Sequence, residues 1–120
     1  MIWMTDHGMR AVREMKAGLF QALSNPTRIH VVELLASAAS DETGEMAVSE
    51  LLDQTGVGAA NLSQHLALLR GKGLVTSRKV GSQVFCRLRD GRIGEVLVLM
   101  KVICATELRR SLETITAGLE

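Results

Sequence analysis

Aromatic residues are almost missing from this sequence, which has two Phe, one Trp and no Tyr among 120 residues. Proteins that bind RNA or single-stranded DNA stack the bases on several aromatic rings. Three rings cannot build such stacking platforms. RNA-recognition sheets and lectin-type sugar sites are therefore not expected.

Cysteine is also scarce, and long apolar runs are missing. The two cysteines, Cys86 and Cys104, show no CxC or CxxC spacing, which argues against a disulfide scaffold or a zinc knuckle. Asp6 follows the short apolar N-terminus, and Glu95 and Lys101 interrupt the most apolar stretch well before a membrane-spanning length. We expect a cytoplasmic protein with no membrane-spanning segment.

The composition is that of a folded protein, with 47% hydrophobic residues, 22% charged residues and a single Pro. A chain of this length holds one ordinary domain, so we expect a single domain over residues 1–120. The sequence has no Ser-His-Asp or Cys-His arrangement, no phosphate-binding glycine loop and no HExxH motif. Enzyme activity is therefore not expected.

Positive charge is concentrated in one part of the chain, although the net charge is only +1. Residues 1–60 contain four basic and eight acidic side chains, whereas residues 61–90 contain six basic side chains and one acidic. A basic segment of this kind is typical of a surface that binds a polyanion. A merely solvated face has the same composition.

Two helices are predicted at the start of the chain. Apolar residues at three- and four-residue spacing predict a helix over Met9–Leu23, and Asn25 with Pro26 is a typical helix start. The second helix is expected to run to about Ala38. Its predicted buried residues are Ile29, Val32, Leu34 and Leu35.

A helix-turn-helix is predicted over residues 49–73, after an exposed loop at 37–45 and a short strand at 46–48. Ser49 is the expected N-cap of its first helix, and Gly73 the expected left-handed residue after its second. The second helix, over Ala59–Lys72, has an apolar stripe. The stripe consists of Leu62, Leu66 and Leu69.

A β-hairpin is predicted over residues 74–89, with its loop at Val80-Gly81-Ser82. Such a hairpin is the wing of a winged helix-turn-helix. Alternation predicts two faces. Val84, Cys86 and Leu88 share one face, and Phe85 and Arg87 share the other.

Residues 90–118 predict one long helix that is apolar nearly all round from Val96 to Cys104. A monomer of this size cannot cover such a helix on every side. We therefore expect a homodimer formed through this helix and the N-terminal helix of residues 1–23. The expected fold class is mainly α with a small β-hairpin wing.

This arrangement predicts a sequence-specific, DNA-binding transcriptional regulator. A helix fits the major groove of double-stranded operator DNA, and a basic wing reaches the neighbouring backbone or minor groove. The candidate contacts lie on the 59–72 helix and on the hairpin. They are Asn61, Ser63, Gln64, His65, Arg70, Lys72, Ser77, Arg78, Lys79, Ser82 and Gln83.

Three segments carry a resemblance to a known family. They are residues 22–28 (ALSNPTR), residues 62–66 (LSQHL), and Leu69-Arg70 with Gly73-Leu74-Val75. Over residues 16–90 the chain resembles the ArsR/SmtB group of bacterial winged-helix repressors. The resemblance implies a cytoplasmic homodimer on operator DNA whose affinity responds to a metal or another ligand. The family's DNA contacts correspond to Ser63, Gln64 and His65.

The effector site departs from that family's patterns. One type of metal sensor has a cysteine pair in the helix that corresponds to Val48–Gln54, and another type has His residues in the last helix; this chain has neither. The remaining candidate ligands for a divalent metal, nickel or zinc, are His7, His30 and Cys104. His7 would meet Cys104 or Glu107 of a second subunit.

Other hypotheses stay open at this point. Cys86, with basic residues near it in sequence, is a candidate reactive thiolate. A protein co-regulator, or no effector at all, is a further alternative. The alternative from another class is a winged-helix docking or dimerisation module that does not read DNA. The basic segment at residues 61–90 favours DNA binding.

Overall fold

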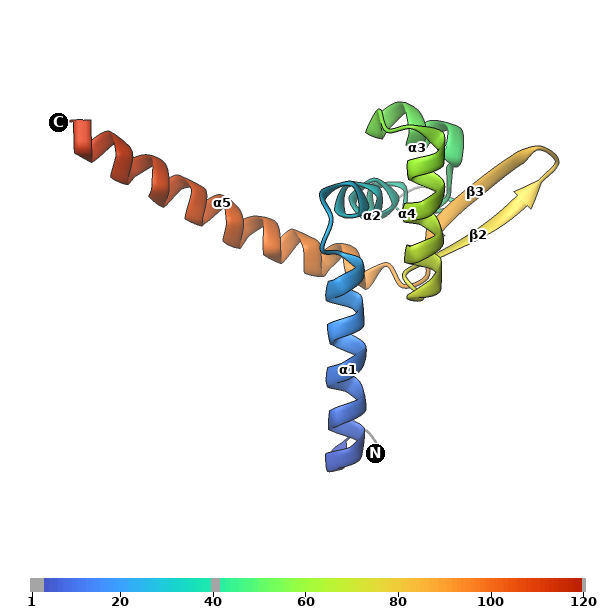
Figure 1. Cartoon of the computed structure of the whole chain (residues 1–120), viewed down its shortest axis with the longest axis horizontal. Helices are drawn as coiled ribbons and strands as arrows, with labels where there is room; N and C mark the ends of the chain where they lie inside the picture. Colours follow the sequence, from blue (N-terminus) through green and yellow to red (C-terminus); the bar gives the residue numbers. More distant parts are fainter. Residues whose placement is uncertain (1–3, 40–41, 120) are drawn as a thin grey trace. The chain divides into compact units, whose positions relative to one another are not determined.

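The computed structural model describes residues 4–39 and 42–119, arranged in two compact units, residues 1–90 and 91–120. The first unit contains every element except the last helix (Figure 1). Residues 40 and 41 of the predicted loop lie outside the described residues, as do residues 1–3. The elements of the first unit are α1 (Asp6–Ala22), α2 (Pro26–Ala38), β1 (Met46–Ala47), α3 (Val48–Thr55), α4 (Ala59–Gly71), β2 (Val75–Val80) and β3 (Gln83–Leu88).

Side-chain caps set the starts of the first two helices. The Thr5 hydroxyl accepts a hydrogen bond from the Gly8 amide at 3.1 Å, so α1 begins at Asp6, one turn before the predicted start. The Asn25 carboxamide oxygen accepts a hydrogen bond from the Arg28 amide at 3.1 Å, and Pro26 follows as the first residue of α2. The predicted start of α2 is confirmed.

The helix-turn-helix consists of α3 and α4. The prediction that Ser49 caps α3 is wrong, because the helix begins at Val48 and Ala47 occupies the N-cap position without a side-chain hydrogen bond. Ala47 is paired with β3 as an extended residue, so the change from strand to helix comes at Val48. Gly56 ends α3 in the left-handed conformation at φ 69°, and this turn leads towards α4.

The core of the first unit lies between α2, α3, α4 and the sheet. Of the predicted α2 residues, Val32 and Leu35 are buried, whereas Ile29 and Leu34 are only half-buried. The predicted leucine stripe of α4 is buried in full. The buried apolar residues are Ala22, Leu23, Val31, Val32, Leu35, Ala38, Leu51, Leu62, Leu66, Leu69, Leu74, Val75, Cys86 and Leu88.

A Schellman motif ends α4 and leads into the wing. The Gly73 amide donates to the Arg70 carbonyl and the Leu74 amide donates to the Leu69 carbonyl, both at 3.0 Å. Gly73 has a φ of 77°, as the predicted left-handed residue should. The chain then enters β2 with Leu74 and Val75 buried.

The wing belongs to a three-stranded antiparallel sheet with the order β1-β3-β2. Val75 lies opposite Leu88 and Val80 lies opposite Gln83, so the hairpin closes through two residues, Gly81 and Ser82. Gly81 has a φ of 61°, which suits the first central position of a two-residue hairpin turn. The predicted hairpin is confirmed, and β1 is the predicted short strand.

The second unit is a single helix, α5 (Arg92–Leu119), close to the predicted range of 90–118. Many of its large apolar side chains are exposed in this single chain. They are Val96, Val98, Leu99, Met100, Val102, Ile103, Leu108, Leu112, Ile115 and Leu119. Among the residues that the structure describes, no helix is long and apolar enough to cross a membrane.

Replacement of two glycines near the end of α4, Gly73 and Gly71, by Ala should change the stability of the protein in opposite directions. Gly73→Ala should lower the free energy of unfolding by about 1 to 2 kcal/mol, because an L-residue is strained at this positive φ. A Cβ at Gly73 would lie 3.5 Å from the nearest heavy atom of Arg89, so crowding adds little. Urea unfolding of Gly73→Ala and of the matched variant Gly71→Ala measures the two changes in the free energy of unfolding.

The matched variant Gly71→Ala lies within α4, where an added Cβ would meet no atom within 4 Å beyond its chain neighbours and the backbone of the helix itself. It should raise the free energy of unfolding by about 0.5 kcal/mol, because Ala loses less backbone entropy than Gly in a helix. Equal effects of the two substitutions would contradict the left-handed assignment of Gly73.

Candidate nucleic-acid interface

The outward face of α4 carries the candidate base-reading side chains. Burial of Leu62, Leu66 and Leu69 turns the opposite side of the helix to solvent, where Ser63 and Gln64 lie exposed. Asn61, one turn before His65, is exposed as well. Short amides and hydroxyls in this position are suited to hydrogen bonds with base edges and phosphates.

His65 differs from the exposed candidate residues Asn61, Ser63 and Gln64, because its side chain is half-buried and contacts another side chain of the same chain. Its Nδ1 lies 3.3 Å from Nη1 of Arg28, and the Nε of Arg28 donates to the Ala22 carbonyl at 2.6 Å. Arg28 therefore links the end of α1 to the side of α4. Sequence reasoning missed this contact, since the two residues are 37 positions apart.

One face of the wing turns towards α4. Residues that oppose each other across β2 and β3 share a face, so Ser77 lies on the same side as buried Cys86, and Lys79 on the same side as Val84. Arg70 of α4 reaches this face and donates from Nη1 to the Ser77 hydroxyl at 3.5 Å. Arg70, Ser77 and Lys79 therefore continue the exposed surface of α4 onto the wing.

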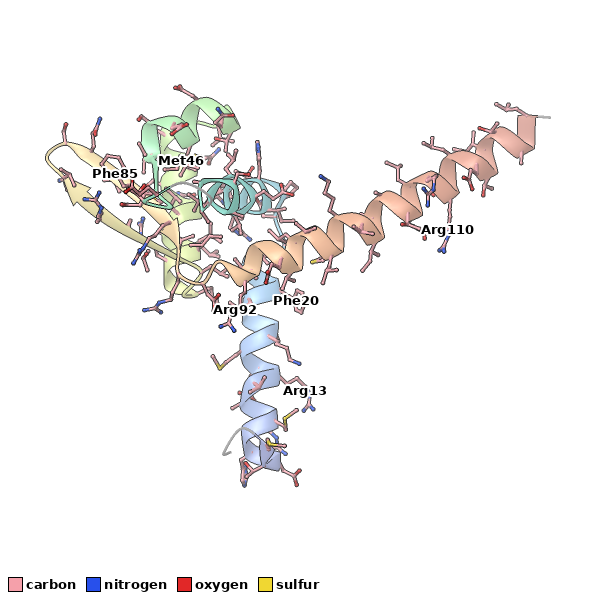
Figure 2. The ribbon with its side chains drawn as sticks, turned by 180° about the vertical axis from the view of Figure 1, so that it is seen from behind. Arg13, Phe20, Met46, Phe85, Arg92 and Arg110 are labelled. Atoms are coloured by element: carbon pink, nitrogen blue, oxygen red, sulfur yellow. The ribbon has the colours of Figure 1, made fainter. Side chains whose placement is uncertain are left out.

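The other face of the wing carries Arg78 and Phe85, which oppose each other in the register. Arg78 donates from Nε to Oε2 of Glu45 at 2.7 Å, and its guanidinium carbon lies 5.2 Å from the centre of the Phe85 ring. The hydrogen bond and charge of Glu45 raise the pKa of Arg78 above its ordinary value. Arg78 therefore stays a cation with a carboxylate partner. Figure 2 labels Phe85 beside Met46 of β1.

The remaining candidates lie at the edges of this surface. Lys72 follows α4, Ser82 lies in the hairpin turn and Gln83 begins β3, and all three are exposed. The structure thus brings most of the eleven predicted residues onto α4 and the α4-facing side or tip of the wing. Arg78 lies on the opposite face of the wing, and Gln83, the register partner of Val80, lies on that face at the tip.

Comparison with known proteins decides the family. The pattern of the family described as bacterial regulatory protein, arsR family, matches residues 25–77. A biofilm growth-associated repressor of Xylella fastidiosa is 34% identical over 105 residues, which cover 87% of this chain and 87% of the repressor. The chain belongs to the ArsR family of bacterial regulatory proteins.

Solved structures of bacterial transcriptional regulators have the same fold. The transcriptional repressor BigR from Xylella fastidiosa has a TM-score of 0.68 and 33% identity, over 83% of this chain and 96% of BigR. A homodimeric winged helix-turn-helix DNA-binding domain from Mycobacterium bovis has a TM-score of 0.71 and 26% identity, over 88% of this chain and 92% of that domain. The predicted winged helix-turn-helix fold is confirmed.

Membership of the ArsR family also decides between the function classes. The chain is a DNA-binding transcriptional regulator and not an enzyme, as the sequence predicted. The basic segment at residues 61–90 coincides with the end of α4 and the wing. The docking-module alternative is not favoured.

The two cysteines of this ArsR-family chain differ in their surroundings. Cys86 is fully buried in β3, and burial raises the pKa of its thiol above the ordinary value, although the charge of Arg70 lowers it somewhat. Burial and the raised pKa both argue against the hypothesis that Cys86 is a low-pKa reactive thiolate. Cys104 is exposed on α5 in the single chain.

The candidate metal ligands lie on three different helices. His7 is exposed on α1, His30 is exposed on α2, and Cys104 is on α5. Over residues 4–39 and 42–119, no group of three or more His, Cys, Asp or Glu side chains is placed to hold a metal ion.

Proposed function

We propose that this chain is a homodimeric repressor that binds a two-fold operator in the bacterial cytoplasm. The single observation that carries the proposal is the continuous exposed surface formed by α4, Arg70 and the α4-facing side of the wing. The relative in Xylella fastidiosa is named a repressor, which supports the same direction of control here.

In this proposal α4 lies in the major groove and the wing reaches the adjacent backbone or minor groove. Asn61, Ser63 and Gln64 read base edges, while Arg70, Lys72 and Lys79 contact phosphates. Two copies would contact half-sites about one helical turn, ~10 base pairs, or a multiple of it apart. The wider set of proposed contacts adds His65, Ser77, Ser82 and Gln83, whereas Arg78 lies on the other face of the wing and is paired with Glu45.

The dimer would form through α5 and α1, within one domain over residues 1–120. Apolar side chains recur on α5 at three- and four-residue spacing, as Leu108, Leu112, Ile115 and Leu119 do, and they are exposed in the single chain. On α1, Met15 and Phe20 are exposed as well. Homodimer interfaces are built from such surfaces, and the domain from Mycobacterium bovis is homodimeric.

DNA binding is tested by fluorescence anisotropy with DNA from the region upstream of the gene, at several salt concentrations. Lys79→Ala should lower the slope of log affinity against log salt by about 0.9, because one phosphate contact is lost. Gln64→Ala should weaken specific binding by about 1 to 3 kcal/mol and leave the slope unchanged. Absence of specific binding by the unaltered protein would support the docking module instead.

Dimer formation is tested by analytical ultracentrifugation. Ile103→Glu should weaken the dimer by about 30-fold or more, because it places a charge on an apolar surface that the dimer buries. Ile103 is 68% exposed in the single chain, so the substitution has little reason to disturb the monomer fold. Arg109→Glu on the same helix is the control for charge. A monomeric unaltered protein of 13.0 kDa would refute the proposal.

We further propose a divalent metal, nickel or zinc, as the effector, held between subunits by His7 and Cys104, with His30 as an additional candidate ligand. The donor types suit these metals, and the exposure of all three leaves them free to meet a second chain. A protein co-regulator is the alternative.

The metal proposal predicts that nickel or zinc changes operator affinity by about tenfold or more, which corresponds to about 1.4 kcal/mol of coupling. His7→Ala should abolish this change without altering affinity in the presence of a chelator. Unchanged metal binding by His7→Ala, measured by equilibrium dialysis, would exclude this site.

A further inference from the structure

An ion pair crosses the outer face of the wing sheet. Arg78 belongs to β2 at one edge of the sheet, whereas Glu45 immediately precedes β1 at the other edge, and β3 runs between them. The Nε of Arg78 nevertheless reaches Oε2 of Glu45 at 2.7 Å. We call Glu45, Arg78 and Phe85 the wing clamp.

The Phe85 ring contacts the Arg78 side chain where that side chain crosses the sheet. Phe85 is the register partner of both Arg78 on β2 and Ala47 on β1, so it lies in the middle of the three strands. The guanidinium of Arg78 stands 5.2 Å from the ring centre, a distance typical of a cation–π contact. The long Arg side chain is thereby held flat across the sheet.

Burial is unequal within the clamp. The Glu45 side chain is only 12% exposed, whereas the Arg78 side chain is 58% exposed. A carboxylate that is largely removed from water needs a charged or hydrogen-bonding partner. Among the described residues, Arg78 is the cation paired with Glu45. The pair is therefore a built contact and not a chance meeting of two surface side chains.

The clamp completes the attachment of the wing to the helix-turn-helix. On the inner face, Arg70 at the end of α4 donates to Ser77 of β2. On the outer face, Arg78 is tied to Glu45, from which the chain passes through β1 directly into α3. Neighbouring residues of one strand thus connect the wing to both helices.

We propose that Arg78 is a positioning residue, which with Glu45 and Phe85 sets the angle of the wing relative to α3 and α4 and does not contact a DNA phosphate. The inference rests on the proposed DNA interface and refines it. Lys79, the next residue, lies on the opposite face of β2 and is the phosphate contact. Arg78 acts on DNA through the position of Lys79.

Glu45 separates this proposal from a direct role of Arg78. If Arg78 contacted phosphate, Glu45 would compete with DNA, and Glu45→Gln would raise operator affinity. If the pair positions the wing, Glu45→Gln and Arg78→Ala both lower affinity. The two hypotheses therefore predict opposite signs for the same substitution.

The experiment measures operator affinity and its salt slope for the full-length dimer by fluorescence anisotropy. Each clamp variant has a matched control that makes the same change of charge and leaves the Glu45–Arg78 ion pair in place. Glu42→Gln removes an exposed acid from the same loop, and Arg87→Ala removes an exposed cation from the same face of the sheet. Circular dichroism at the assay temperature confirms that each variant is folded.

We expect Glu45→Gln and Arg78→Ala to weaken binding, each on the order of fivefold relative to its control, a size typical of coupled contacts. Neither should lower the salt slope beyond the change in its control, whereas Lys79→Ala lowers it by about 0.9. The charge swap, Glu45→Arg with Arg78→Glu, should recover part of the lost affinity because the pair is restored in reverse.

Three results would overturn the proposal. They are a rise in affinity for Glu45→Gln above that of Glu42→Gln, a drop in the salt slope for Arg78→Ala equal to that for Lys79→Ala, and a charge swap that binds no better than Arg78→Ala. Failure of the proposed interface is seen separately, because Lys79→Ala and Gln64→Ala would then leave binding unchanged.

Discussion

Burial of one leucine stripe orients the surface that matters for function. Leu62, Leu66 and Leu69 are buried where α4 packs against α2 and the sheet, and this fixes the rotation of α4 about its own axis. Ser63 and Gln64 are consequently held outward and exposed. The apolar side of the helix thus determines what its polar side can read. A substitution in the stripe would rotate or loosen α4 and change DNA binding without touching DNA.

A different kind of interaction holds the wing in position. The hairpin extends beyond the core, and its outer residues from Ser77 to Gln83 have little apolar burial to hold them. Polar contacts take over there, through Arg70 and Ser77 on one face and Arg78 and Glu45 on the other. Such contacts are directional, so they define an angle, where a hydrophobic contact mainly defines a distance. A flexible protrusion is thereby held in one position, and in the proposed interface it is a fixed part of the DNA-binding surface.

The local elements could be predicted from the sequence because their signals are local. Asn25 and Pro26 mark the start of α2, the leucine spacing marks α4, and Gly81 marks the hairpin turn. The Ser49 cap could not be rejected in this way, because pairing of Ala47 with β3 moves the start of α3. Likewise, nothing in the sequence around Glu45 indicated that it forms an ion pair. Its partner Arg78 lies 33 positions further on, and only the β1-β3-β2 order brings the two together. The strand register decides which face of the sheet the Arg78 side chain occupies, and local sequence patterns do not determine that register.

The uncovered apolar residues of α5 have a consequence for how much of the protein a cell must make. A helix of 28 residues gains most of its stability from packing, and here the packing surface is exposed in the single chain. When a second copy supplies that packing, folding and assembly become one equilibrium, and the stability of each chain depends on the concentration of the other. Dilution would then remove the helix contact, the fixed spacing of the two α4 helices and resistance to proteolysis together. Below a threshold level of expression, the chain would be degraded in addition to being released from DNA.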